Sequence, residues 1–193
     1  EISCSLVGSE MCIRDRIITM REVSESMERV IAGPERKGRV MNEKTKHTIA
    51  YHESGHALVG HLLDHADPVH KISIISRGRA LGYTLSIPDE DKVLNSLSEM
   101  KDELAVFMGG RVAEEIFCDD ITTGASNDIE QATKLARSMI SRFGMSDEFG
   151  FVAFETVSNQ YLGGDAALAC SPETQARIDR KVTEMVDTQY QKA

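Results

Sequence analysis

The sequence predicts a mainly α-helical fold with one small β-hairpin. In about five segments, hydrophobic residues recur three or four positions apart, as they do on the buried face of a helix. One stretch instead alternates hydrophobic and polar residues on both sides of a turn, which is typical of a hairpin. The 193 residues are 41% hydrophobic and 27% charged, and this composition indicates a globular domain with a buried core.

Residues 1–16 show no periodicity and join abruptly to an amphipathic segment. They lack the basic region and apolar run of a signal peptide, so we interpret them as a non-native cloning or sequencing scar, with a disordered native arm as the alternative. Cys4 and Cys12 lie in this segment. Cys118 and Cys170 form no Cys-x-x-Cys pair, so the sequence predicts neither a disulfide framework nor a cysteine zinc site, and a reducing compartment is favoured.

Charge and hydropathy argue against two classes of protein. The formal net charge is −9, which leaves no basic surplus to neutralise phosphates, so we expect no nucleic-acid partner. No apolar run approaches the length that crosses a bilayer, so we expect the chain itself to be soluble.

The first half of the chain contains two predicted helices and the hairpin. The first helix covers residues 20–31 and stops before Gly33 and Pro34, which commonly follow a helix. The polar linker 33–46 indicates a domain boundary. A second helix is predicted over residues 43–63. From 71 to 88, hydrophobic residues alternate around an Arg-Gly-Arg turn, which predicts the hairpin.

The second half of the chain contains three predicted helices. In the first, over residues 92–117, Gly109 and Gly110 each cost about 1 kcal/mol relative to alanine. This pair therefore indicates a close backbone approach, a kink or a break. After a loop at 118–127, the next helix has a hydrophobic face that includes Ile129 and Phe143. The last helix opens at Ser171 with proline at its first position, a typical N-terminal cap.

The second predicted helix carries His52-Glu53-Ser54-Gly55-His56, a His-Glu-x-x-His motif. Residues four apart lie one turn above each other, so both imidazoles can point at one ion. Zinc accepts neutral imidazole nitrogens, and a catalytic zinc keeps a water beside three protein ligands. Glu53 would be the general base for this water, whose pKa the metal lowers to roughly 7. The alternative is a surface helix with idle histidines; Gly55 argues against it, because a purely structural helix has no reason to accept a glycine.

The third ligand is not evident near the motif. The positions that a metzincin would use are Val59 and Leu62, and no acidic residue occurs between residues 67 and 89. The candidates are more distant carboxylates: Glu114, Glu115, Asp119, Asp120 and Asp128. Asp128 is attractive because it opens a helix after a run of small residues, where backbone N–H groups can hold a carboxylate. An ordinary capping role for Asp128 is an equal alternative.

Four segments resemble the peptidase domain of the FtsH family, the membrane-anchored, ATP-dependent zinc proteases of bacteria, mitochondria and chloroplasts. These segments are HESGHALVGHLL, ISRGRALGYTLSIP, LAVFMGGRVAEEIF and TTGASNDIEQATKLARSMISRFGMSDEFG. The resemblance extends over about residues 17–193. It implies a mainly α, helical zinc metallopeptidase domain with one small β-hairpin.

The resemblance also implies roles for individual residues. Asp128 would be the third ligand of one zinc ion per chain, beside His52 and His56. Glu114 would be a carboxylate that supports the metal site by orienting a ligand histidine, and a solvated helix face is the alternative. The hairpin would lie beside an extended substrate that adds by main-chain pairing, and a plain edge hairpin is the alternative.

The domain organisation follows from the same resemblance. Residues 17–41 would be the tail of the ATPase module with a linker, and residues 42–193 the zinc peptidase domain. The sequence contains no Gly-x-x-x-x-Gly-Lys phosphate loop and no membrane anchor, so we expect a fragment whose ATP-binding module lies elsewhere. The family implies a homohexamer, unfolded polypeptide substrates and a location on the cytoplasmic, matrix or stromal side of a membrane.

Two positions depart from the family pattern, and one competing function remains. Ser54 stands where the family usually has alanine, and Ser76 stands where proline is common in the hairpin. The competing function is a non-catalytic helical assembly module with a structural or vestigial metal site. Glu53 discriminates between the two, because a structural site has no use for a base and is closed by a fourth protein ligand.

Overall fold

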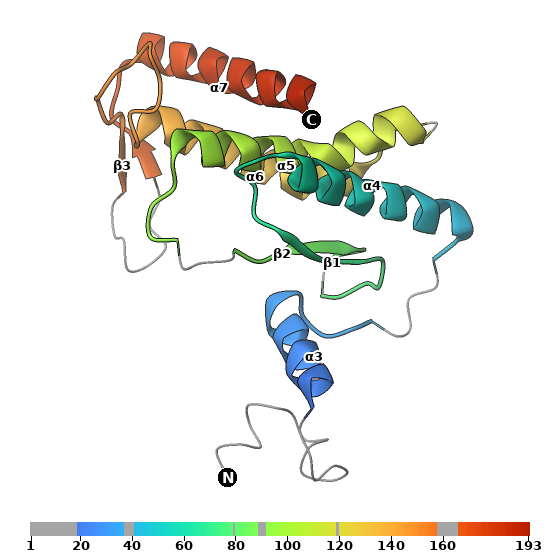
Figure 1. Cartoon of the computed structure of the whole chain (residues 1–193). Helices are drawn as coiled ribbons and strands as arrows, with labels where there is room; N and C mark the ends of the chain where they lie inside the picture. The colour runs from blue at the N-terminus through green and yellow to red at the C-terminus, as the bar shows by residue number, and fades with distance from the viewer. Residues whose placement is uncertain (1–18, 37–40, 79, 89–91, 119, 158–165) are drawn as a thin grey trace. The chain divides into compact units, whose positions relative to one another are not determined.

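The computed structural model describes residues 19–36, 41–78, 80–88, 92–118, 120–157 and 166–193 (Figure 1). In chain order the elements are α3 (Met20–Ile31), α4 (Glu43–Leu62), β1 (Val69–Ser73), β2 (Tyr83–Ser86), α5 (Leu97–Phe117), the short 3-10 helix η1 (Thr123–Ala125), α6 (Ser126–Ser141), β3 (Glu155–Val157), β4 (Ala166–Leu168) and α7 (Pro172–Lys192). The described fold is mainly helical, which confirms the predicted class. The segment interpreted as a scar lies outside the described residues.

Local capping explains where two of the helices, α5 and α7, begin. The helix expected from residue 92 begins at Leu97, because the Ser96 hydroxyl accepts from the Glu99 N–H and the Glu99 carboxylate accepts from the Ser96 N–H at 2.7 Å. This reciprocal pair is a capping box, which satisfies two backbone donors at the start of a helix. The predicted cap of the last helix is confirmed, since Ser171 accepts from the Thr174 N–H and Pro172 occupies the first turn.

The described strands form two two-stranded sheets. β1 pairs with β2, which confirms the predicted hairpin. β3 pairs with β4 in antiparallel register, with Glu155 opposite Leu168. The second sheet was not predicted, because strands of three residues are too short to show the alternation on which strand prediction depends.

The chain divides into two compact units. The smaller unit contains α3, the start of α4 up to Ala50, and residues 73–83. Within it, Glu28 on α3 is buried and receives hydrogen bonds from Arg77 at 3.0 Å and from the Tyr83 hydroxyl at 2.9 Å. These bonds hold α3 against the turn of the hairpin.

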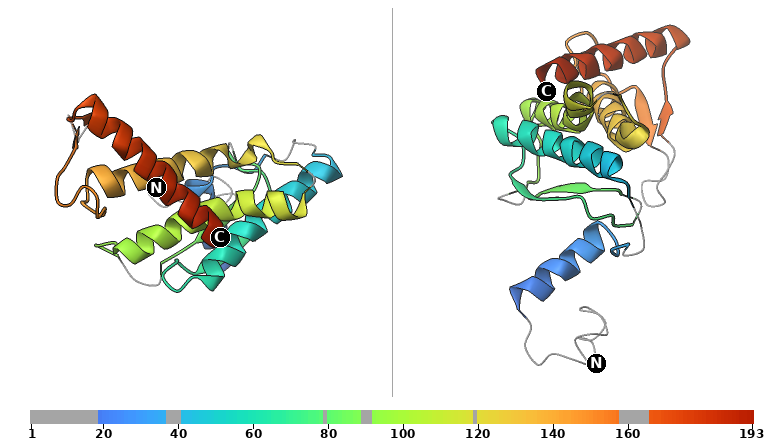
Figure 2. Two further views of the ribbon diagram at one scale, coloured as in Figure 1. Left: turned by 90° about the horizontal axis from the view of Figure 1, so that it is seen from above. Right: turned by 90° about the vertical axis from the view of Figure 1, so that its right-hand side faces the viewer.

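The larger unit consists of residues 51–72 and 84–193. In it, α7 packs across α5 and α6, and these two helices also pack against each other (Figure 2). Their shared core is formed by Met100, Leu104, Met108, Ala132, Ala136, Met139, Ile140, Phe149, Ile178 and Val182. Ile129 and Phe143, expected on the hydrophobic face of α6, are instead 40% and 49% exposed, and Phe143 follows this helix, which ends at Ser141.

Helices α4 and α5 approach each other closely at two glycines. A Cβ atom on Gly55 would lie 2.4 Å from the Gly109 carbonyl oxygen, and one on Gly109 would lie 2.8 Å from the Gly55 carbonyl oxygen. Of the three explanations for the Gly109-Gly110 pair, the structure confirms the close approach, since α5 is continuous. The structure also shows that the argument from Gly55 was wrong. A purely structural helix does have a reason to accept this glycine, which is the close packing of α4 against α5.

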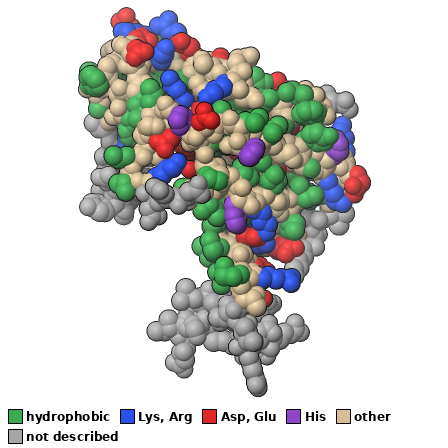
Figure 3. Space-filling model, in the orientation of Figure 1, with side chains coloured by type: hydrophobic (Ala, Val, Ile, Leu, Met, Phe, Trp, Pro, Cys, Tyr) green, Lys and Arg blue, Asp and Glu red, His purple; other side chains and the backbone are tan. Residues whose placement is uncertain are grey.

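The surface carries charges of both signs among hydrophobic side chains, as the face in Figure 3 shows. Cys118 and Cys170 are free thiols. Among the helices that the structure describes, none combines the length and the apolarity that a bilayer crossing needs.

Candidate metal centre

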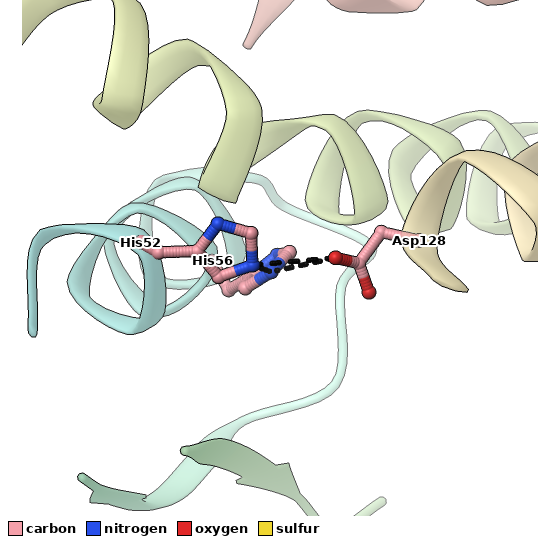
Figure 4. A group of neighbouring side chains, drawn as sticks. All are labelled: His52, His56 and Asp128. Atoms are coloured by element: carbon pink, nitrogen blue, oxygen red, sulfur yellow. Dashed lines mark hydrogen bonds and ion pairs between the residues drawn. The ribbon is translucent and has the colours of Figure 1, made fainter. Parts of the chain in front are cut away.

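The structure brings His52, His56 and Asp128 together. The two histidines lie one turn apart on α4, and Asp128 comes from the first turn of α6 (Figure 4). The two Nε2 atoms are 3.0 Å apart, and Asp128 Oδ2 lies 3.3 Å from that of His52 and 3.6 Å from that of His56. Within the described part of the chain, this is the one group of three such side chains whose possible ligand atoms lie within 4.8 Å of one another.

The outward ring nitrogens of both histidines are already engaged. His56 Nδ1 lies 2.7 Å from the Val106 carbonyl oxygen, and His52 Nδ1 lies 2.8 Å from Glu114 Oε1. A carbonyl oxygen can only accept, so His56 Nδ1 carries the proton, and the Glu114 carboxylate favours the same tautomer of His52. In the neutral rings, both Nε2 lone pairs therefore face the Asp128 carboxylate. Three acceptors that converge in this way are stabilised by a cation between them.

The charges of the cluster reinforce one another. Burial alone would raise the pKa of Asp128, but the adjacent imidazoles of His52 and His56 outweigh burial and hold that pKa at about 2. Burial alone would lower the pKa of His52, but Asp128 outweighs it and raises that pKa. Asp128 is therefore ionised at neutral pH, so its negative charge is available to a cation. A proton on Nε2 and a metal ion would each place a positive charge beside the Asp128 carboxylate.

The spacing of the three donor atoms fits zinc. Ligand atoms on one tetrahedral zinc, each about 2.0–2.1 Å from the ion, lie about 3.3 Å from one another. The observed separations of 3.0, 3.3 and 3.6 Å bracket this value. Among the described residues, no fourth histidine, cysteine or carboxylate joins the group, which leaves one tetrahedral position without a protein ligand.

The structure separates four of the five candidates for the third ligand. Asp128 is at the site, in the first turn of α6, whose N-cap residue is Ala125. Glu114 contacts His52 at Nδ1, the ring nitrogen that is not part of the group of possible ligand atoms. Glu115 is exposed and accepts from the Tyr190 hydroxyl, and the exposed Asp120 accepts from the Ile121 N–H at 2.9 Å. Asp119 lies outside the described residues.

Glu53 lies beside the cluster without belonging to it. Its side chain is buried, and burial raises the pKa of its carboxyl group, opposed by a hydrogen bond from the Thr84 hydroxyl at 2.9 Å and by the charges of His56 and His52. A carboxylate with a raised pKa is a better proton acceptor than an ordinary surface glutamate. Thr84 is on β2, so the hairpin fixes the orientation of this carboxylate.

Glu114 is 1% exposed, so the solvated-face alternative is wrong for this residue. Its Oε1 atom faces His52 Nδ1, and its Oε2 atom accepts from the Thr122 N–H at 2.7 Å. This is the geometry of a carboxylate that orients a ligand histidine.

Sequence reasoning missed three of the groups that shape the site. The Val106 group is a backbone carbonyl, which no residue type signals, and the Thr84 hydroxyl reaches Glu53 only through the tertiary fold. A Cβ atom on Gly110 would lie 2.5 Å from His56 Nε2. The imidazole rings therefore have room only because residue 110 has no side chain. The Gly-Gly pair was the available signal, although it did not indicate the imidazoles.

Comparison with known proteins shows which family the sequence matches. Residues 39–193 match the family model described as Peptidase family M41. The ATP-dependent zinc metalloprotease FtsH of Slackia heliotrinireducens is 63% identical over 181 residues, which cover 90% of this chain and 23% of that protein. FtsH 1 of Thermoanaerobacter sp. is 49% identical over 91% of this chain and 29% of its own length, and FtsH of Rubrobacter xylanophilus is 49% identical over 91% and 28%. The chain spans about a quarter of the length of these curated relatives.

Proposed function

The chain belongs to peptidase family M41, and we propose that it is the zinc-dependent endopeptidase domain of an FtsH-like ATP-dependent protease. Its substrates would be unfolded polypeptides or membrane proteins. The observation that carries the proposal is the convergence of His52, His56 and Asp128 beside the buried carboxylate of Glu53. The similarity to proteins named ATP-dependent zinc metalloproteases supports it.

We propose His52 Nε2, His56 Nε2 and Asp128 Oδ2 as the zinc ligands. Two neutral imidazoles and one carboxylate are donors that zinc prefers, and three protein ligands with one open position are typical of a catalytic zinc. The bound ion would polarise the scissile carbonyl group and lower the pKa of a water molecule to roughly 7.

The residues of this chain would then supply orientation and proton transfer. Glu53 would take the proton of the attacking water and pass it to the leaving amine, and its raised pKa suits a group that both accepts and donates. The Thr84 hydroxyl would hold one oxygen of Glu53, so that the other faces the reacting water. Glu114 and the Val106 carbonyl would keep both imidazoles in the tautomer that presents Nε2.

We propose the wider organisation from the family. Residues 42–193 would be the peptidase domain, and residues 17–41, which include α3, would be the tail of an ATPase module with its linker. The complete protein would assemble as a homohexamer, and its AAA ATPase module would bind ATP and deliver unfolded polypeptide. A membrane anchor in the complete protein would hold this domain on the cytoplasmic, matrix or stromal side.

The test separates catalysis from metal binding. We expect Glu53→Gln to keep one zinc per chain and to lose casein cleavage, because the amide cannot accept the proton. We expect Asp128→Ala to weaken zinc binding by at least about 10-fold. Metal content is measured by elemental analysis after gel filtration, and cleavage by release of labelled casein peptides.

Two surface variants provide matched controls. Glu130→Gln removes a carboxylate that pairs with Lys134 on α6, and Asp179→Ala removes one that pairs with Arg137. Both should retain zinc and activity. Equal cleavage by Glu53→Gln and the parent chain would show that the catalytic role is wrong. If the parent chain and Glu53→Gln both bind zinc and neither cleaves casein, the result would instead favour the non-catalytic assembly module.

A further inference from the structure

Thr122 holds the carboxylate of Glu114 at both oxygens. The Thr122 N–H donates to Glu114 Oε2 at 2.7 Å, and its hydroxyl donates to Glu114 Oε1 at 3.2 Å. Glu114 Oε1 is also the atom that faces His52 Nδ1 at 2.8 Å. The orientation of this carboxylate toward the histidine is therefore fixed by one residue from the loop after α5.

Thr122 also caps η1, the short helix that precedes the helix with Asp128. It is the N-cap of η1, and its hydroxyl accepts from the Gly124 N–H at 3.1 Å. η1 ends at Ala125 and α6 begins at Ser126, so no residue separates η1 from the helix whose first turn carries Asp128. The Thr122 hydroxyl thus contacts both Glu114, whose carboxylate faces His52, and η1, which directly precedes the helix that carries Asp128.

We propose that Thr122 is a positioning residue for the metal site, which sets the separation of His52 from Asp128 and so the affinity for the metal. This inference rests on the proposed function. Glu114 is 1% exposed, and a buried carboxylate needs hydrogen bonds in place of water. Arg111 Nη1 lies 3.8 Å from Glu114 Oε2, beyond hydrogen-bond distance. Among the described residues, the direct donors to Glu114 are therefore Thr122 and His52, although Thr122 itself is exposed.

The experiment compares three variants of the full chain. Thr122→Val keeps the branched shape and the backbone N–H but removes the hydroxyl, whereas Thr122→Ser keeps the hydroxyl. Thr188→Val is the matched control, because the Thr188 hydroxyl donates to the Glu184 carbonyl on the exposed side of α7 at 2.7 Å. Zinc affinity is measured by competition with a chromogenic chelator, and the melting temperature of the metal-free chain is measured beside it.

We expect Thr122→Val to weaken zinc binding by about 10-fold, the lower end of the range for groups that orient metal ligands. Thr122→Ser should restore most of this affinity, and Thr188→Val should leave it unchanged. The Co²⁺-loaded chain should also show an altered visible absorption band for Thr122→Val alone, because the ligand geometry changes. A structural role of Thr122 would lower only the melting temperature.

A double-mutant cycle tests whether Thr122 acts through Glu114. The losses of zinc affinity caused by Thr122→Val and Glu114→Ala should combine to less than their product, since both interrupt one chain of contacts. Unchanged zinc affinity and an unchanged Co²⁺ spectrum in Thr122→Val would overturn the inference while the proposed function stands. Failure of the parent chain to bind zinc would overturn the proposed function itself. If Glu114→Ala does not fold, the serine rescue and the Co²⁺ spectrum decide.

Discussion

Gly110 offers the sharpest test of the metal site, because a single methyl group there would clash with both imidazoles. A Cβ atom there would lie 2.5 Å from His56 Nε2 and 2.6 Å from His52 Nε2. Ordinary contact begins at 3.4 Å, so the rings would have to retreat by about 0.9 Å, whereas metal sites tolerate shifts of about 0.2 Å. We therefore expect Gly110→Ala to weaken zinc binding by roughly 100-fold or more.

The same substitution should leave the metal-free chain folded. Alanine in place of glycine within a helix stabilises it by about 1 kcal/mol, and Gly110 has no positive φ that would oppose the change. Overpacking against the rings costs about 1–3 kcal/mol. The free energy of unfolding should therefore fall by no more than about 2 kcal/mol, which urea unfolding with a chelator present can measure.

Gly60→Ala is the matched control for Gly110→Ala. A Cβ atom on Gly60 would meet Val69 Cγ2 at 3.4 Å and Val106 Cγ2 at 3.7 Å, which are ordinary contacts. This variant should gain up to about 1 kcal/mol of stability and keep its zinc affinity. A Gly110→Ala chain that binds zinc as tightly as the parent would refute the assignment of the two Nε2 atoms as ligands.

Two further predictions concern the fold. Gly55→Ala would place a methyl group 2.4 Å from the Gly109 carbonyl oxygen, so we expect urea unfolding to show a loss of about 1–3 kcal/mol. Glu99 has its pKa lowered from 4.5 to about 2 by hydrogen bonds from the Ser96 backbone and side chain. Because the folded pKa is the lower one, its stabilisation is present above about pH 4.5 and is lost as the pH falls toward 2. Glu99→Gln should flatten the stability profile between these values, and an identical profile would contradict the capping box.

The fold could be predicted from the sequence wherever the signal was local. The five helices and the hairpin follow from hydrophobic periodicity, and the caps at Ser96 and Ser171 refine where two helices begin. The short strands β3 and β4 carry too few residues for a pattern. Ile129 and Phe143 continue the hydrophobic periodicity and are nevertheless partly exposed, so periodicity alone does not reveal which positions of the face are covered.

The sequence by itself determined that His52, Glu53 and His56 share one region of a helix, because the α-helical repeat brings residues four apart to one face. Only the tertiary structure decided what meets them. Asp128 lies far along the chain among several equivalent carboxylates, and Glu114 and the Val106 carbonyl reach the imidazoles through the packing of α4 against α5. That packing depends on Gly55 and Gly109, whose missing side chains let the two backbones approach. Spacing along a helix is encoded locally, whereas the meeting of distant segments is set by the whole packed core.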